Sequence, residues 1–198
     1  MNLRFTSFHL PTVRHEIDEG LANALTAARF AAGLGANIVL FKAASLEIYA
    51  RTIPRFLDAL DEANLGLTPV LQNHFGTAIS TLDDYKRVLA SVVDDPRMKA
   101  ILEVGHFQRA GVSWEQGWDY LGDRVALIHL NEIRAGQSVL FGAGEVDFPG
   151  LMRRVKSSGY LGDIVVELEL SNRECNPEET IDGVEQAVKV LETCYCEA

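Results

Sequence analysis

Short apolar runs alternate along this chain with longer amphipathic segments, and this alternation constrains the fold more than any other feature of the sequence. The runs predict strands at Leu3–Phe8, Asn37–Phe41, Leu67–Leu71, Ala100–Val104, Val125–Leu130 and Ile164–Leu168. Segments of helical period lie between or after them, at Ile17–Leu34, Ala50–Asn64, Leu82–Val93, Trp114–Leu121, Phe148–Ser158 and Pro177–Thr193. Strands separated by helices form parallel sheets with right-handed crossovers. The sequence therefore predicts an α/β fold, and because no linker-like segment divides the chain, a single domain over residues 1–198.

Local capping signals agree with this division into strands and helices. Gly35 stands where a helix C-terminal cap belongs, and Thr81 with Asp84 forms the pattern of a capping box. Pro177 suits the first turn of the last helix. A G-x-G-x-x-G turn is absent from the sequence, which disfavours a Rossmann nucleotide-binding domain.

Composition and charge exclude several classes of protein. The chain has 198 residues, of which 47% are hydrophobic and 23% charged, as expected for a folded globular domain. Its net charge of −10 disfavours binding to nucleic acid. Polar residues interrupt the most apolar stretch, Leu21–Phe41, so we expect no membrane partner. The N-terminus lacks the features of a signal peptide, and three cysteines form no disulfide framework, so we expect a reduced, cytoplasmic compartment.

Four polar side chains stand at or just beyond the carboxyl ends of successive apolar runs: Gln72, Glu103, His129 and Glu167. Each is separated from the next by about one βα unit. In a parallel barrel, inward side chains at these strand ends meet at the mouth, which is where such enzymes carry out their chemistry. Two carboxylates, an imidazole and an amide oxygen suit Mn²⁺, Mg²⁺ or Co²⁺, and Zn²⁺ is also compatible with them. The alternative is that each residue is a capping or surface residue. Two buried carboxylates without a cation would, however, cost several kcal/mol.

Five segments of the chain resemble one known family. Leu71–His74, Leu102–His106 and Ile128–Glu132 are similar to the strand-end motifs of the xylose isomerase-like TIM-barrel superfamily, and Gly142–Phe148 and Gly159–Glu167 to its later loop and last strand. That superfamily includes sugar-phosphate isomerases and epimerases, inosose dehydratases and endonuclease IV. The resemblance implies that Gln72, Glu103, His129 and Glu167 ligate the metal and that His106 contacts substrate.

The chain departs from the family pattern in its ligands and in its length. The family usually has glutamate at the position of Gln72 and aspartate at that of Glu103. Leu3–Phe8 corresponds to the third strand of the family, so we expect a partial TIM barrel that lacks the first two βα units. The first and last strands would then have open edges. Either the sequence is part of a longer gene product or a partner chain closes the sheet, and we expect a homo-oligomer.

The resemblance also implies a reaction, namely metal-dependent isomerisation or epimerisation of a sugar or polyol. Such enzymes transfer a proton at a carbon next to a carbonyl, through an enediolate. Glu167 would be both ligand and base, whereas Gln72, at the opposite catalytic position, cannot act as a carboxylate base. Substitutes for that second base are Glu132, Glu169 or His74. A single base still allows aldose–ketose isomerisation or syn elimination, and two-base epimerisation is less favoured.

Further polar residues are candidates for contact with substrate. Lys42 could bind a carboxylate or phosphate, or be solvated, and His9 could line the mouth or make a strand-end hydrogen bond. Arg134 could clamp an anionic group or lie on a surface loop, and His74 follows the Gln72 position. Two other functions stay open: a non-catalytic, degenerate barrel that binds a ligand, and an endonuclease IV-like phosphodiesterase. The latter needs additional histidine and aspartate ligands, and Glu132–Leu140 contains no histidine.

Overall fold

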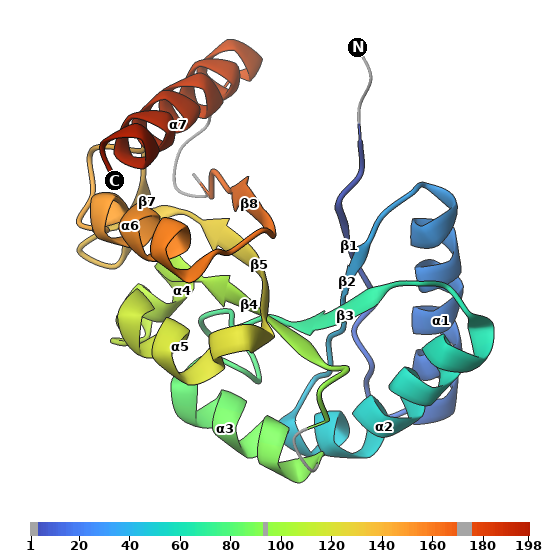
Figure 1. The fold of residues 1–198 in the computed structure, drawn as a ribbon. Helices are drawn as coiled ribbons and strands as arrows, with labels where there is room; N and C mark the ends of the chain where they lie inside the picture. The colour runs from blue at the N-terminus through green and yellow to red at the C-terminus, as the bar shows by residue number, and fades with distance from the viewer. Residues whose placement is uncertain (1–3, 93–94, 170–175) are drawn as a thin grey trace.

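A curved sheet of six parallel strands forms the centre of the computed structural model, which describes residues 4–92, 95–169 and 176–198 (Figure 1). The strands lie in the order β1-β2-β3-β4-β5-β8, and each neighbouring pair is parallel. Their bounds are Ser7–His9 (β1), Ile38–Leu40 (β2), Thr68–Leu71 (β3), Lys99–Glu103 (β4), Val125–Leu130 (β5) and Asp163–Val166 (β8). The predicted α/β fold with a parallel sheet is therefore confirmed.

Helices cover the convex, outer side of this sheet and the last helix lies beyond β8 (Figure 1). They are α1 (Ile17–Gly33), α2 (Leu46–Ala63), α3 (Leu82–Ser91), α4 (Val104–Arg109), α5 (Trp114–Leu121), the 3₁₀ turn η1 (Gly122–Arg124), α6 (Phe148–Ser158) and α7 (Pro177–Glu197). Most of the core lies between sheet and helices, for example where Phe41 and Phe56 stack 4.4 Å apart. A smaller apolar cluster fills the concave side and includes Leu40, Ile101 and Leu127.

The predicted capping signals are present. The Thr81 hydroxyl accepts from the backbone N–H of Asp84, and the Asp84 carboxylate accepts from that of Thr81, which is a capping box. Gly35 has φ +81°, a backbone conformation that few residues other than glycine adopt, just after α1. Pro177 opens α7 after the cap Asn176. These local interactions fix where each helix begins or ends, as the sequence predicts.

Some predicted boundaries are wrong. Helix α2 begins at Leu46 instead of Ala50, because the Ser45 hydroxyl accepts from the backbone N–H of Ile48 and so caps the helix earlier. Strand β1 begins at Ser7, within the predicted Leu3–Phe8, whose first residue lies outside the described part of the chain. Helix α4 and the antiparallel hairpin of β6 (Glu132–Arg134) and β7 (Gln137–Val139) were not predicted. These elements are too short to produce a periodic pattern in the sequence.

The sheet does not close into a full barrel. Strands β1 and β8 are its two outer strands, and Figure 1 shows the open side between them. Arg4 and Asp163, 3.6 Å apart, form an ion pair between the residues leading into β1 and the first residue of β8, but both are well exposed. The architecture is that of the predicted partial barrel. Within the described ranges, no helix is both long and apolar enough to cross a bilayer.

Tyr85 on α3 ties the outer helical layer to the ends of two strands. Its fully buried hydroxyl lies 2.9 Å from the Leu71 carbonyl oxygen and 3.0 Å from that of Ile101, and burial raises the pKa of Tyr85 well above its usual value. We expect Tyr85→Phe to lower the free energy of unfolding by about 1–3 kcal/mol, because buried carbonyls lose their donor. Urea denaturation measures this. The exposed Tyr195→Phe is the control, and equal changes in both variants would contradict the prediction.

Candidate metal centre

The carboxyl ends of four strands bring the predicted ligands into contact. Glu103 ends β4 and lies in register with His129 on β5, while Gln72 follows β3 and Glu167 follows β8. Gln72 Nε2 donates to Glu103 Oε2 at 2.9 Å. His129 Nδ1 lies 2.9 Å from the same Glu103 oxygen and 2.8 Å from Glu167 Oε1. These four side chains therefore form one connected cluster, which we call the inner cluster.

The inner cluster is largely buried, and His129 is its one source of positive charge among the four side chains. The side chains of Glu103 and His129 are 0% and 2% exposed. Burial raises the pKa of Glu103 although His129 opposes this. Burial alone would lower the pKa of His129, but hydrogen bonds to Glu103 and Glu167 raise it to about 9, and His129 in turn holds the pKa of Glu167 below its usual value. A proton on His129 thus balances part of the charge of two neighbouring carboxylates.

These residues fit a divalent cation. Among the described residues, Glu103 Oε1 and His129 Nε2 are buried without a hydrogen-bond partner. The single N–H at His129 Nδ1 is shared between Glu167 Oε1 and Glu103 Oε2, and the latter also accepts from Gln72 Nε2. The oxygen and nitrogen of the Gln72 amide are interchangeable by a flip, which would turn its oxygen toward the same point. Two carboxylates, an imidazole and an amide oxygen match the preferences of Mn²⁺, Mg²⁺ and Co²⁺.

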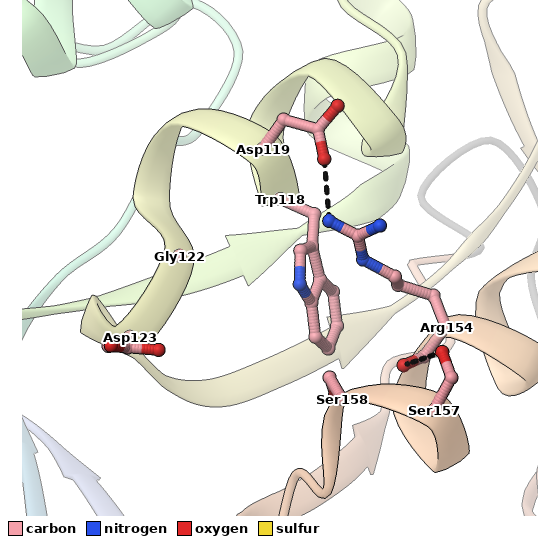
Figure 2. Close-up of a pocket in the computed structure, with 7 residues that line it drawn as sticks. All are labelled: Trp118, Asp119, Gly122, Asp123, Arg154, Ser157 and Ser158. Atoms are coloured by element: carbon pink, nitrogen blue, oxygen red, sulfur yellow. Dashed lines mark hydrogen bonds and ion pairs between the residues drawn. The ribbon is translucent and has the colours of Figure 1, made fainter.

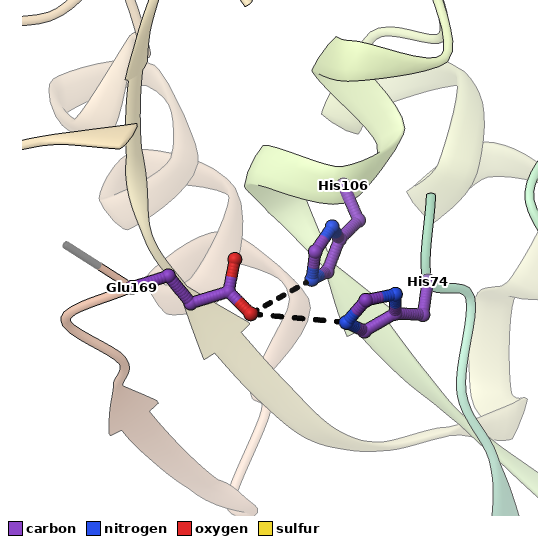
Figure 3. Close-up of side chains that lie close together, drawn as sticks. All are labelled: His74, His106 and Glu169. Carbon is purple, nitrogen blue, oxygen red and sulfur yellow. Dashed lines mark ion pairs between the residues drawn. The ribbon is translucent and has the colours of Figure 1, made fainter. Parts of the chain in front are cut away.

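A second group, here the outer cluster, consists of His74, His106 and Glu169 (Figure 3). Glu169 Oε1 lies 3.4 Å from His106 Nε2 and 3.7 Å from His74 Nε2. His106 is 1% exposed. Burial, and to a smaller extent the charge interaction with His74, lowers the pKa of His106 to about 4, so the ring is neutral near pH 7. Arg109 Nη1 contacts the other Glu169 oxygen at 3.5 Å. Sequence reasoning missed Arg109, although its position one helical turn after His106 was a usable signal.

Lys42 and His9, for which the sequence left two positions open, lie in contact just after β2 and at the end of β1. Lys42 Nζ donates to His9 Nδ1 at 2.7 Å. Burial lowers the pKa of His9 to about 4, and burial also lowers the pKa of Lys42 against the attraction of Glu167. A cavity of 470 Å³ opens beside Gln72, large enough for a small ligand. Its lining is Thr12, Arg14, Lys42, Ala43, Ala44, Tyr49, Gln72, His74, Gly76, Thr77 and Ala78.

Arg134 lies on the surface, which is one of the two alternatives that the sequence left open, whereas Glu132 is buried away from the position expected of a base. Arg134 is exposed on the β6–β7 hairpin, and none of the contacts within the described ranges joins it to either cluster. Glu132 is buried, and its carboxylate accepts from the backbone N–H groups of Gly142 at 3.2 Å and Val146 at 3.1 Å. Glu132 thus holds the following loop in place, and we no longer consider it as a substitute base.

Two buried asparagines, which sequence reasoning missed, position the Glu103 segment. Asn73 Nδ2 donates to the Glu103 carbonyl at 3.0 Å, and the Glu103 N–H donates to Asn73 Oδ1 at 3.1 Å. Asn131 Oδ1 accepts from the Gly105 N–H at 2.9 Å. A Cβ at Gly105 would lie 2.0 Å from that same oxygen, so only glycine allows this approach. The sequence could have indicated this role, because Asn73 directly follows Gln72 and Asn131 stands two residues after His129.

Another pocket, of 420 Å³, lies between α5 and α6, next to the amino ends of β5 and β8 (Figure 2). There Arg154 pairs with Asp119 at 2.6 Å and lies over the Trp118 ring. Barrel enzymes carry out their chemistry at the carboxyl ends of their strands. This pocket is therefore not a candidate for the catalytic site of a barrel enzyme.

Comparisons with known proteins agree with the fold. A family model described as xylose isomerase-like TIM barrel matches residues 3–194. Inosose dehydratase from Mesomycoplasma hyopneumoniae (strain 232) is 25% identical over 187 residues, covering 75% of this chain and 62% of that protein. The chain spans about half the length of the curated relatives it matches.

Solved structures with the same fold are similar over nearly the whole chain. The crystal structure of a D-tagatose 3-epimerase-like protein has a TM-score of 0.76 at 14% identity, covering 98% of this chain and 79% of that one. The IOLI protein, solved with a bound zinc atom, has a TM-score of 0.72 at 14% identity, covering 98% and 77%. At these identities the likeness shows the fold alone.

Proposed function

The chain belongs to the xylose isomerase-like TIM barrel family, and from this premise we propose that it is a metal-dependent enzyme that moves a proton at the carbon beside the carbonyl of a sugar or polyol. The observation that carries the proposal is the contact of Gln72, Glu103, His129 and Glu167 at the strand ends, with one buried and one partly exposed carboxylate around one imidazole. Such an arrangement is costly unless a cation is bound.

In this proposal the four residues of the inner cluster hold a divalent cation, Mn²⁺, Mg²⁺, Co²⁺ or Zn²⁺. When bound, the ion supplies a Lewis acid that polarises the carbonyl and the neighbouring hydroxyl of the substrate. Glu167 acts as the base, because its side chain is 24% exposed and so reaches the mouth, whereas Glu103 is enclosed. The low pKa of Glu167 keeps it ionised and able to accept a proton at neutral pH.

Substrate binding is proposed for residues at the rim of the inner cluster. Lys42 and His9 form a hydrogen-bonded pair that can bind a substrate oxygen, and Lys42 can return a proton to it. His74 and His106 face the mouth from the side of Glu169. Arg134 is retained only as a group that could meet an anionic substrate at the entrance. Because Gln72 is no carboxylate base, we propose one-base isomerisation over two-base epimerisation.

Elimination of water is a second candidate, favoured by the curated relatives that carry the name inosose dehydratase. Glu167 would again take the proton beside the carbonyl. The electrons of that C–H bond form a C=C bond as the neighbouring C–O bond breaks, and the leaving hydroxyl takes a proton from Lys42. The product is an unsaturated ketone with an ultraviolet absorption that an isomerisation product lacks.

The remaining parts of the proposal concern setting and partners. We propose a small sugar or polyol as the ligand and a cytoplasmic location, because the described cysteines Cys194 and Cys196 are free thiols. A second copy of the chain would contact the open edges of β1 or β8, because unpaired edges favour association.

Metal binding tests the proposal through stability. We expect Mn²⁺ at about a hundred times its Kd to add about 2.7 kcal/mol to the free energy of unfolding, because only the folded chain presents the four ligands together. Glu103→Gln removes a buried ligand and should abolish most of this increment, whereas the exposed Glu115→Gln on α5 should preserve it. Urea titrations with Mn²⁺ or with EDTA measure the effect. No Mn²⁺ response in the unmodified protein would favour the non-catalytic, degenerate barrel.

A further inference from the structure

Helix α7 carries a row of exposed apolar side chains, here called the α7 stripe. Ile181, Val184, Val188 and Tyr195 are between 42% and 58% exposed. None of the other described helices exposes more than one large hydrophobic side chain. Single exposed apolar residues are ordinary, whereas apolar residues gathered along one element mark a surface that another molecule covers.

The spacing of the α7 stripe is that of a coiled-coil seam. Its positions are three, four, three and four residues apart, which is the heptad repeat, and they are Ile181, Val184, Val188, Leu191 and Tyr195. Leu191 is half-buried against the core, and the other four are exposed. Apolar residues at this repeat form a continuous strip along a helix, which a second helix lying beside it buries. The α7 stripe therefore fits a partner helix.

Another side of α7 already packs against the rest of the molecule, and this fixes the direction of the stripe. Gly183 and Ala187 are buried, and a Cβ at Gly183 would lie 3.1 Å from the Leu168 side chain. Gln186 Nε2 donates to the Phe141 carbonyl at 2.8 Å. Through this side α7 contacts α6 and β8, at the border of the open side of the sheet (Figure 1). Turning the stripe inward would break these contacts.

Negative charge borders the α7 stripe on its solvent side. Glu178, Glu185 and Glu192 are seven residues apart, so all three take the same position of the repeat, next to the seam. Pro177–Glu197 contains six acidic residues and one lysine, a net charge of −5, which is half of the −10 of the whole chain. That lysine, Lys189, lies 3.9 Å from Glu185, and both side chains are well exposed, so this ion pair offsets little of the charge. A helix that docks here needs positive charge beside its own apolar residues.

The same charges disfavour a second copy of the chain as the occupant. In an antiparallel pair of α7 helices related by a two-fold axis, this position of the repeat faces itself, so the two glutamate rows would meet. Like charges that face each other across a helix pair are destabilising. A parallel pair would instead need the sheet-side border of the seam, where Ala187 and Cys194 pack toward the core. Neither arrangement matches the surface as it stands.

From these observations we propose that the α7 stripe is a docking surface for an amphipathic helix of another protein, whose apolar heptad seam is flanked by Lys or Arg. Burial of the seam provides the affinity, as in other helix-on-groove complexes. The glutamate row provides the selectivity, because complementary charges exclude partners of the wrong sign. This inference is independent of the proposed function, since α7 contributes no residue to the inner cluster or the outer cluster.

Two synthetic peptides test the docking surface on the full chain. Both are as long as α7 and have leucine at the seam positions, but one has lysine beside the seam and the other has glutamate there. Fluorescence anisotropy of the labelled peptides at low salt measures binding. We expect the lysine peptide to bind at least about tenfold more tightly than the glutamate peptide, because attraction to the glutamate row becomes repulsion. The preference should shrink at high salt, which screens exposed charges.

Two variants separate the seam from the charges beside it, and circular dichroism checks that they fold. Val184→Gln combined with Val188→Gln makes the centre of the stripe polar and should weaken the lysine peptide by about tenfold or more. Leu161→Gln, at a 98% exposed position outside α7, is the matched control and should bind as the unmodified chain does. Glu185→Lys combined with Glu192→Lys should reverse the preference, so that the glutamate peptide binds more tightly.

Several results would overturn the proposal. They are equal binding of the two peptides, absence of binding by either, and binding that the glutamine substitutions leave unchanged. Analytical ultracentrifugation tests the remaining occupant. A dimer of the unmodified chain that becomes a monomer in the glutamine variant would show that a second copy covers the α7 stripe, which also contradicts the proposal. None of these results depends on metal binding, so the proposed function stands or falls separately.

Discussion

Glu167→Gln is expected to lower the rate of proton exchange at the substrate carbon by about 10²–10⁴-fold, the usual loss when a general base is removed. Glutamine has nearly the shape of glutamate but accepts no proton from carbon. The side chain sits 2.8 Å from His129 and is partly open to the mouth, so the change affects the reacting group more than the fold. Deuterium uptake from D₂O into a panel of ketoses and inososes, followed by proton NMR with Mn²⁺ present, measures the exchange.

Because Glu167 is also a proposed ligand, loss of the ion must be separated from loss of the base. The assay is therefore repeated over a range of Mn²⁺ concentrations. A defect that persists at saturation indicates the base, whereas recovery to within about tenfold of the unmodified rate would show that Glu167 is a ligand only. Glu115→Gln, far from the mouth on α5, should exchange at the unmodified rate.

The inner cluster could be predicted from the sequence because it depends on periodic features. Strand side chains alternate between faces, so the inward face of each apolar run is known once the run is found. Glu103 and His129 end adjacent parallel strands, and this order follows from the alternation of strands and helices. The sequence did not determine whether Gln72 and Glu167 contact this pair. The structure shows that they do, because Gln72 lies 2.9 Å from Glu103 and Glu167 lies 2.8 Å from His129.

The outer cluster and the supporting contacts could not be predicted in the same way. His106 lies on the short helix α4, and Arg109 is bound by Ser138 from a hairpin of two three-residue strands. Neither element is long enough to produce a periodic pattern. Glu132 was a candidate base because of its position after His129, but the loop that follows folds back and its N–H groups bind the carboxylate. Contacts of this kind are determined by tertiary structure.

Asn73→Ala is the substitution for which we expect the largest loss of stability, about 2–5 kcal/mol. The Asn73 side chain is fully buried and makes two hydrogen bonds to the backbone of Glu103, one as donor and one as acceptor. Alanine leaves the N–H and the carbonyl of Glu103 buried and unpaired, and each such group costs about 1–3 kcal/mol. Asn131→Ala should cost less, because only the Gly105 N–H loses its partner and Asn131 Nδ2 has none among the described residues. Urea denaturation of both variants measures which of them loses more free energy of unfolding.

Stability alone does not show that Asn73 positions the proposed metal ligand Glu103, so the affinity for Mn²⁺ is the second measurement. We expect Asn73→Ala to weaken Mn²⁺ binding by about 10–100-fold, as loss of contacts behind a ligand usually does. Val88→Ala is the matched control, because Val88 is buried in the outer layer on α3 and its loss destabilises the fold without a contact to either cluster. If both variants bound Mn²⁺ equally well, Asn73 would support the fold without positioning Glu103, since the ligand would then keep its place when both backbone hydrogen bonds are gone.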